Sequence, residues 1–169
     1  TAVKRLLVHE DILDEFTGRF VEEAATYNYG DPADPDTRVG TVIDEEAAIY
    51  LENVVNDAVA LGARVLLGGT REGALMTPTV IADVPRDADI VVKESFGPLA
   101  PIMKVSDIDD AIELANATAY GLSSGIVTRD MDRAIRAVKG IQTGTVNIIQ
   151  VPGYRIDCSP PLHRYVYVV

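Results

Sequence analysis

The chain of 169 residues has one cysteine, two histidines and no tryptophan. The single cysteine, Cys158, cannot form an internal disulfide, so we expect a reducing, cytoplasmic setting. His9 and His163 lie at opposite ends of the chain, and no Cys/His cluster has the spacing of metal ligands, so we expect no metal site. No apolar run reaches the roughly 18 residues typical of a membrane-spanning helix, and no secretory signal opens the sequence.

Basic residues are also scarce. Lys and Arg number 15 against 26 Asp and Glu, which gives a net charge of −11 and a pI near 4.5. This balance argues against a nucleic-acid or anionic-membrane surface, since either partner requires a basic patch. Hydrophobic residues make up 47% of the chain, which at this length is enough for the core of one domain.

Apolar periodicity alternates along the chain between short strand-like runs and longer helical ones. Strands are predicted at 5–8, 64–67, 79–81, 101–105, 124–127 and 145–148, and helices at 10–25, 44–61, 87–93, 106–116 and 130–139. Ser106 is expected to cap the helix that follows it. The alternation predicts an α/β fold, a parallel sheet with helices packed on its faces in three layers.

The segment from Glu94 to Pro98 is the most informative stretch. A carboxylate and an aromatic ring stand two residues apart, and the following Gly97-Pro98 restricts the backbone. A carboxylate can accept two hydroxyl hydrogen bonds, so Glu94 could bind a ribose diol. Alternatively, Glu94 is a solvated acid at a helix end. The chain has neither a G-x-G-x-x-G loop nor a P-loop, so no phosphate-binding loop is predicted.

Hydrolase and thiol chemistry have little support. The sequence contains no G-x-S-x-G elbow. Nothing near Cys158 pairs with it as a base, and no helix start or cationic neighbour that would lower its pKa can be placed. We therefore interpret Cys158 as a structural or incidental thiol.

Several motifs, taken in order, resemble the aldehyde dehydrogenase superfamily. The segment Glu94-Ser95-Phe96-Gly97-Pro98 is similar to that family's E-x-F-G-P signature, and residues 116–122 are similar to N-x-T-x-Y-G-L. Gly144-Thr145-Val146 and Ser159-Pro160 resemble later landmarks of the catalytic domain. The resemblance covers residues 1–160, whereas the tail 161–169 does not continue the family pattern. Tyr165 to Val169 favours a strand, which if left unpaired would be an edge that invites association.

The resemblance implies that residues 1–160 are a catalytic domain that begins just after the family's nucleophilic cysteine. That cysteine, the general-base glutamate and the dinucleotide-binding domain are then expected upstream of Thr1. By this resemblance no catalytic residue lies in the chain, which alone is expected to be inactive. Glu94 would hold the nicotinamide-ribose hydroxyls and Phe96 would pack on the nicotinamide end of NAD or NADP. The parent enzyme would oxidise an aldehyde to a carboxylic acid by covalent catalysis, and we expect it to be a homo-oligomer.

Residues 151–155 bear on the substrate. The resemblance places them near the substrate mouth, where Arg155 could attract an anionic group by a bidentate contact. The pattern is similar to members that oxidise phosphonoacetaldehyde or lactaldehyde, so a small anionic or hydroxylated aldehyde is expected. Alternatively, Arg155 pairs with a surface acid such as Asp157. For the chain as a whole, the alternative function is a stand-alone binding or interaction module without catalysis.

Overall fold

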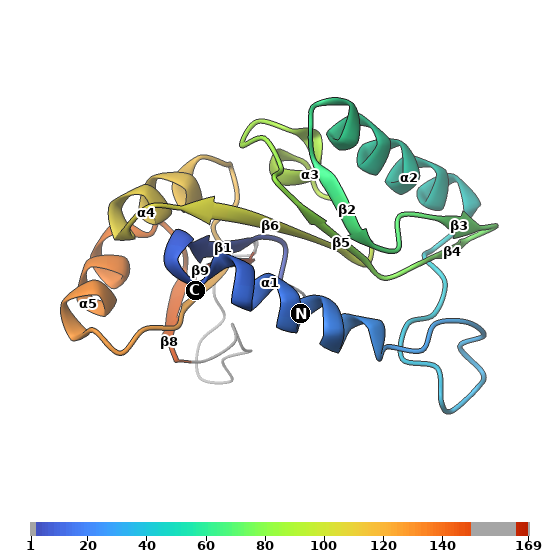
Figure 1. Ribbon diagram of the computed structural model, residues 1–169, viewed down its shortest axis with the longest axis horizontal. Helices are drawn as coiled ribbons and strands as arrows, with labels where there is room; N and C mark the ends of the chain where they lie inside the picture. The colour runs from blue at the N-terminus through green and yellow to red at the C-terminus, as the bar shows by residue number, and fades with distance from the viewer. Residues whose placement is uncertain (1–2, 150–164, 169) are drawn as a thin grey trace. The chain divides into compact units, whose positions relative to one another are not determined.

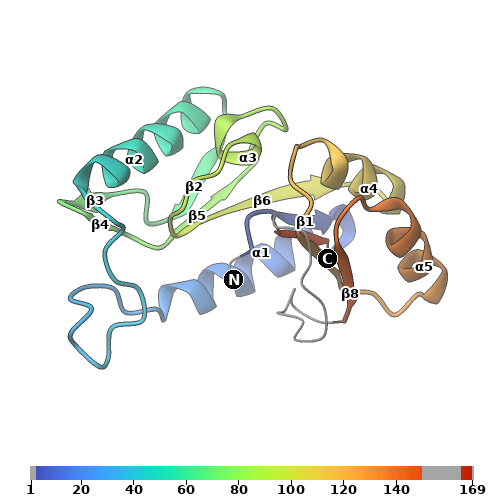
Figure 2. The same cartoon turned by 180° about the vertical axis from the view of Figure 1, so that it is seen from behind.

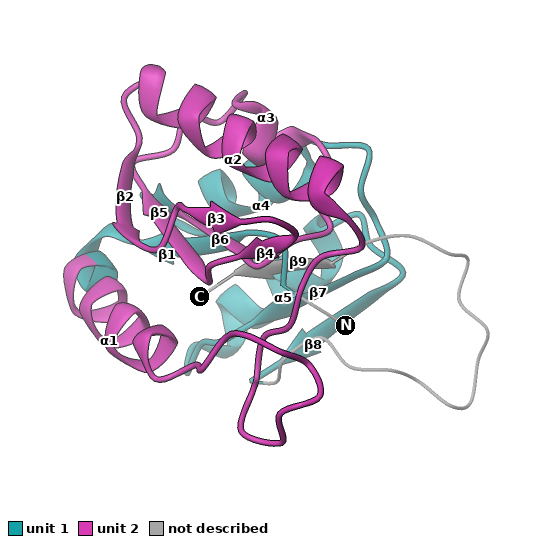
Figure 3. Cartoon of the chain, turned by 90° about the vertical axis from the view of Figure 1, so that its right-hand side faces the viewer, with its two compact units in different colours: residues 1–13, 103–169 teal, residues 14–102 magenta. Residues whose placement is uncertain are grey.

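The computed structural model describes residues 3–149 and the backbone of residues 165–168, which are traced in Figure 1. These residues divide into two compact units, coloured separately in Figure 3: those within 1–13 and 103–169 form unit 1, and residues 14–102 form unit 2. Thr1, Ala2, Arg155 and Cys158 lie outside the described residues. Within the described part, no helix is long and apolar enough to cross a membrane.

Unit 2 contains the two longest helices of the described chain and a short β-hairpin. Its elements in chain order are α1 (Leu13–Ala25, of which Leu13 belongs to unit 1), α2 (Glu45–Ala60), β2 (Arg64–Leu67), β3 (Arg71–Glu72), β4 (Leu75–Met76), β5 (Thr79–Ala82), α3 (Asp89–Val92) and β6 (Leu99–Val105, shared with unit 1 from Met103).

The core of unit 2 is built by α2 and β5 (Figures 1 and 2). The Asp44 side chain caps α2 by accepting from the Ala47 backbone N–H at 2.8 Å, and the helix buries one apolar face: Ala48, Leu51, Val54, Val55 and Ala58. Every residue of β5 is buried. Arg71 of the hairpin binds Glu45 and Glu52 of α2 at 3.2 and 3.0 Å, which ties the hairpin to that helix.

Strand pairing in unit 2 is only partly parallel. β5 runs parallel to β6, as expected, but β2 runs antiparallel to β5. The connection between β2 and β5 holds only the β3–β4 hairpin, whereas a parallel pair requires a crossover of a dozen or more residues, about one helix. Because the connection is short, β2 and β5 pair in antiparallel orientation. The alternation of strands and helices in the sequence did not predict this pairing.

Unit 1 contains the remaining strands and two helices. Its elements are β1 (Leu6–His9), a single 3₁₀ turn (Glu10–Ile12), α4 (Ile108–Asn116), β7 (Ser123–Ile126), α5 (Met131–Gly140), β8 (Thr145–Ile148) and β9 (Tyr165–Val168). These four strands lie side by side in the order β1-β9-β7-β8. All pairings among them are parallel. The α/β fold with parallel strands is thus confirmed.

The start of α4 differs from the sequence prediction. Its cap is Asp107, whose carboxylate accepts from the backbone N–H groups of Asp109 and Asp110, both at 2.9 Å. Ser106, the expected cap, instead donates its own backbone N–H to the Asp110 side chain at 3.0 Å. Asp and Ser both cap helices well, so two adjacent candidates left the sequence ambiguous by one residue. Asp130 caps α5 in the same way as Asp107 caps α4.

A polar network joins β7 to β8. Ser123 and Ser124 are buried at 3% and 0% exposure, which would be costly without hydrogen bonds. Ser124 Oγ lies 2.9 Å from Thr143 Oγ1, and Ser123 Oγ accepts from Thr145 Oγ1 at 2.7 Å. Asn147 donates to the Ser124 carbonyl at 2.9 Å. These bonds explain how so polar a strand occupies a buried position.

Candidate functional site

The segment from Glu94 to Pro98 forms a turn in unit 2 between α3 and β6. Phe96 adopts a left-handed backbone with φ of 49°, a conformation that bulky residues rarely take. Its ring is nevertheless 87% exposed, while Ser95 beside it is buried and Glu94 is half-buried. The turn therefore holds an aromatic ring out to solvent with a carboxylate close to it in the chain.

Packing behind the turn fixes this conformation. A Cβ at Gly97 would lie 2.3 Å from Leu51 Cδ1, and Leu51 is fully buried on α2. Only a glycine permits so close an approach. The Pro98 carbonyl accepts from the Thr79 backbone N–H at 2.8 Å, which fastens the end of the turn to β5. The strain at Phe96 is therefore held by the core of unit 2.

Lys93, which precedes Glu94 in the sequence, forms an ion pair with Asp89. Lys93 donates from Nζ to Asp89 Oδ2 at 2.7 Å, and this hydrogen bond, together with the charge of Asp89, raises the pKa of Lys93. The pair links Lys93, just after α3, to Asp89 at the start of that helix. The half-buried Glu94 carboxylate lies on the turn just beyond this pair.

The second motif, residues 116–122, braces unit 1. Asn116 at the end of α4 donates from Nδ2 to the Gly140 carbonyl at 2.8 Å and accepts from the Gln142 backbone N–H at 2.8 Å. It thereby joins the carboxyl ends of α4 and α5. Tyr120 is 5% exposed. Asn116 and Tyr120 of this motif therefore serve hydrogen bonding and packing within unit 1.

Arg5 is a buried charge whose partners the sequence pattern did not reveal. Its side chain is completely buried and donates to the carbonyls of Leu114 and Ala115 at 3.0 and 3.1 Å. These carbonyls belong to the last turn of α4, where the helix dipole favours a cation. The Arg5 guanidinium also lies 5.9 Å from the centre of the Tyr120 ring. Burial lowers the pKa of Arg5 to about 10, so the group stays protonated at neutral pH.

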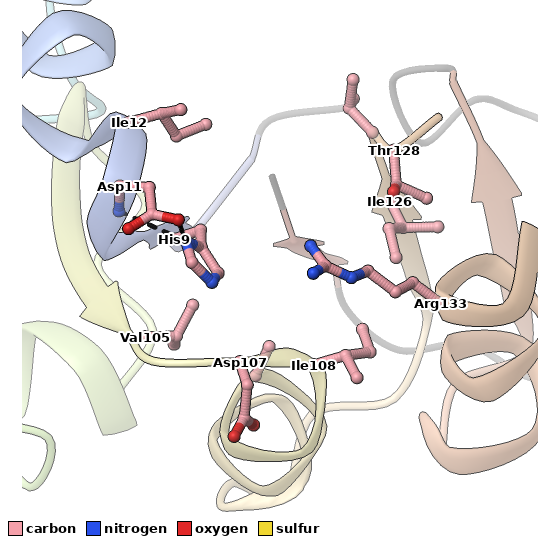
Figure 4. A pocket seen from close by; sticks show the side chains of 11 residues that line it. His9, Asp11, Ile12, Val105, Asp107, Ile108, Ile126, Thr128 and Arg133 are labelled. Atoms are coloured by element: carbon pink, nitrogen blue, oxygen red, sulfur yellow. Dashed lines mark hydrogen bonds and ion pairs between the residues drawn. The ribbon is translucent and has the colours of Figure 1, made fainter. Parts of the chain in front are cut away.

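A pocket of about 220 Å³ lies in unit 1, at the carboxyl ends of β1, β6 and β7 (Figure 4). His9 and Arg133 reach into it from opposite sides, and Val105, Ile108 and Ile126 give it apolar walls. The volume is below the roughly 300 Å³ usual for ligand sites. His9 Nδ1 also accepts from the Asp11 backbone N–H at 3.2 Å, so His9 caps the 3₁₀ turn that follows β1.

The sequence-predicted site residues are placed as follows. Glu94 and Phe96 lie together on the unit 2 turn. Arg155 is outside the described residues, as is Cys158. In the described ranges, no group of three or more His, Cys, Asp or Glu side chains could hold a metal ion.

Comparison with known proteins identifies what the motifs belong to. The sequence model of the Aldehyde dehydrogenase family matches residues 1–160. The NADP(+) succinate-semialdehyde dehydrogenase of Deinococcus radiodurans is 43% identical over 148 residues, which are 86% of this chain and 31% of that protein. The lactaldehyde dehydrogenase of Methanococcus maripaludis is 35% identical over 159 residues, 94% of this chain and 34% of its own length.

A solved structure of an aldehyde dehydrogenase is also similar to this chain. Aldehyde dehydrogenase 21 from Physcomitrella patens, in complex with the reaction product succinate, superposes with a TM-score of 0.86 at 41% identity. The match covers 92% of this chain and 32% of that one. The chain thus spans about one third of the length of the relatives it matches.

Proposed function

The chain belongs to the aldehyde dehydrogenase family, and we propose that it is the part of an NAD(P)-dependent enzyme that presents Glu94 and Phe96 to the nicotinamide end of the cofactor. Members of this family are NAD(P)-dependent oxidoreductases, and the Deinococcus radiodurans relative is named for NADP(+). The reaction we infer is oxidation of an aldehyde to a carboxylic acid. The observation that carries the proposal is the Phe96 ring, held 87% exposed on a strained backbone.

The residues of the turn fit the nicotinamide-ribose half of the cofactor. A flat, exposed aromatic ring offers a stacking face, and the half-buried Glu94 carboxylate can accept hydrogen bonds from two ribose hydroxyls. When bound, the cofactor supplies the acceptor for a hydride. In this account, Glu94 orients the ribose, and Phe96 limits the position of the nicotinamide ring. The contact between Gly97 and Leu51 keeps Glu94 and Phe96 in place.

We further propose a small anionic or hydroxylated aldehyde as the substrate. The relatives support this range, since their names specify succinate semialdehyde and lactaldehyde. The proposed recognition residue is Arg155, whose guanidinium suits a carboxylate by bidentate hydrogen bonding. Its position lies outside the described residues, so this assignment depends on the sequence resemblance.

We also infer that the parent enzyme is a homo-oligomer. No residue of α1 is buried in the described chain, although Phe16 and Phe20 stack there with ring centres 5.8 Å apart. Covering these rings would remove apolar area from water. A non-catalytic binding module is the alternative function, and the intact Glu94–Pro98 turn favours the enzyme over it.

A chimaera tests the proposal directly. Residues 1–160 replace the matching segment of the Deinococcus radiodurans succinate-semialdehyde dehydrogenase, which supplies the rest of the enzyme. We expect NADP-dependent oxidation of succinate semialdehyde, and we expect Phe96→Ala and Glu94→Gln each to raise the cofactor KM by about tenfold, one lost contact. Glu46→Gln, at an exposed position in the first turn of α2, is the matched control.

The same chimaera tests the substrate assignment through the KM values for an anionic and a neutral aldehyde. Arg155→Ala is expected to raise KM for succinate semialdehyde about tenfold or more and to leave KM for a neutral aldehyde unchanged. Arg19→Ala, on the exposed face of α1, is the arginine control. A folded chimaera without activity would contradict the enzyme assignment. An unchanged preference for the anionic aldehyde in Arg155→Ala would contradict the role of Arg155 alone.

A further inference from the structure

The turn at residues 94–98 is held against α2 on its carboxyl side, and Lys93 stands at its amino side. A Cβ at Gly97 would lie 2.3 Å from Leu51 Cδ1 of α2, so the backbone is packed closely there. Lys93 directly follows α3 and has an extended backbone, with φ of −104° and ψ of 152°. In an extended chain, successive side chains point to opposite sides. The direction taken by Lys93 therefore determines the side on which Glu94 leaves the backbone.

Groups on two helices attract the Lys93 ammonium. Its Nζ donates to Asp89 Oδ2 at 2.7 Å, four residues back on α3. This hydrogen bond and the charge of Asp89 raise the pKa of Lys93, and Tyr50 and Asp57 of α2 add smaller contributions in the same direction. Tyr50 and Asp57 are about two helical turns apart and share one face of α2. Lys93 is therefore drawn toward the helix that also packs against Gly97.

We propose that Lys93 and Asp89 are positioning residues for the turn, which orient the backbone that carries the Glu94 carboxylate. The positioning role rests on the proposed function of the turn, in which that carboxylate accepts hydrogen bonds from two ribose hydroxyls. Both bonds depend on distance and angle, so a small rotation at Lys93 weakens both of them. The contact of Gly97 restrains the turn on the Phe96 side, and the ion pair restrains it on the Glu94 side.

The exposure of the pair separates positioning from a contribution to stability. The Lys93 and Asp89 side chains are 59% and 42% exposed, and ion pairs exposed to this degree contribute little to the stability of a fold. Breaking the pair should therefore weaken cofactor binding and leave the midpoint of thermal unfolding unchanged.

The signs of two substitutions separate positioning from simple charge attraction. The chain carries a net charge of −11, and the dinucleotide is also an anion. If the two residues acted only through their charges, loss of the Lys93 cation would weaken cofactor binding and loss of the Asp89 anion would strengthen it. If the pair positions Glu94, both losses weaken binding.

Substitutions in the chimaera with the Deinococcus radiodurans enzyme test the proposal. Lys93→Gln and Asp89→Asn should each raise the KM for NADP about threefold, the effect expected for an exposed pair, and neither should change the KM for succinate semialdehyde. Lys93→Arg keeps a cation for Asp89 and should lie near wild type. Glu15→Gln breaks an ion pair of the same i,i+4 spacing with Arg19 on α1 and is the matched control.

The Glu94→Gln background shows whether the pair acts through Glu94. Asp89→Asn should raise the KM for NADP no further there, because no carboxylate is left to position. A KM unchanged by Glu94→Gln itself would contradict the proposed function of the turn, and the positioning role with it. A KM raised by Glu94→Gln, but unchanged by Lys93→Gln and Asp89→Asn or lowered by Asp89→Asn, would overturn the positioning role alone. A lower midpoint of thermal unfolding in both variants would assign the pair to stability and would also overturn it.

Discussion

The two motif segments of this chain place their aromatic residues in opposite environments. In unit 2, the turn at residues 94–98 holds Phe96 at 87% exposure, and in unit 1 the segment 116–122 holds Tyr120 at 5%. The first segment uses the core behind it to display a ring. The second uses Asn116 to fasten two helix ends to each other. A sequence motif can therefore place its aromatic residue on the surface or use its residues as a structural brace.

This comparison divides residues into those whose substitution should lower stability and those whose substitution should weaken binding. Loss of a bracing residue should lower the free energy of unfolding, since it leaves buried polar groups without partners. Loss of a displayed residue should leave stability nearly unchanged and should affect binding. The four substitutions below test that division, in order of expected effect on stability.

Arg5→Ala should cause the largest loss. It removes a fully buried side chain and leaves the carbonyls of Leu114 and Ala115 without their donors, so the free energy of unfolding should fall by about 3–5 kcal/mol. Because burial lowers the pKa of Arg5 only to about 10, the loss should be the same at pH 6 and pH 8. Urea unfolding measures it, and the exposed Arg19→Ala should cost less than about 1 kcal/mol.

Gly97→Ala should come next. The new Cβ would lie 2.3 Å from Leu51 Cδ1, so we expect a loss of about 1–3 kcal/mol from overpacking. Gly18→Ala is the matched control, since nothing lies within 4 Å of a Cβ there and alanine favours the helix by about 0.5–1 kcal/mol. Equal thermal shifts for the two variants would show that Leu51 does not restrain the turn.

Asn116→Ala should cost about 1–2 kcal/mol, because it removes one donor and one acceptor that join α4 to α5. Asn116→Asp keeps the acceptor for the Gln142 N–H but loses the donor to the Gly140 carbonyl. The lost donor is replaced by a carboxylate oxygen that faces the Gly140 carbonyl at the ends of two helices, where an anion is unfavourable. We therefore expect Asn116→Asp to be no more stable than Asn116→Ala in urea unfolding, and an aspartate variant as stable as wild type would contradict the brace as described.

Phe96→Ala should change the free energy of unfolding by less than about 0.5 kcal/mol, because an exposed side chain buries little area. Relief of the left-handed backbone is not expected, since alanine also has a Cβ. A large loss of stability on thermal unfolding would mean that the ring packs on the protein. Phe96 would then belong with Tyr120 rather than with a binding surface.

The sequence predicted most of the fold because its signals are local. Apolar spacing located α2, and Asp130 with its following residues located α5. Three features depend on long-range contacts and were not predicted: the antiparallel pairing of β2, the helix-end carbonyls that Arg5 binds and the pairing of β9 on both sides. Arg5 is separated by more than 100 residues from the carbonyls it binds, so no local pattern could indicate its partners.

The turn that carries the candidate site residues was predicted in part for the same reason. Glu94 and Phe96 are close in sequence, and the structure places them on one turn. What holds that turn, the contact between Gly97 and Leu51, joins segments distant in the chain and appears only in the structure. Glycine before proline was the only local indication of a restrained backbone.

The central claim is that the Glu94–Pro98 turn contacts the nicotinamide-ribose end of a dinucleotide. Saturation-transfer NMR on this chain with nicotinamide mononucleotide, and with AMP as the reference ligand, tests it most directly. The account predicts transfer to the nicotinamide and ribose protons of the mononucleotide, lost in Phe96→Ala and Glu94→Gln and retained in Glu46→Gln. Absence of transfer in the wild-type chain, or transfer unchanged by both turn substitutions, would contradict it.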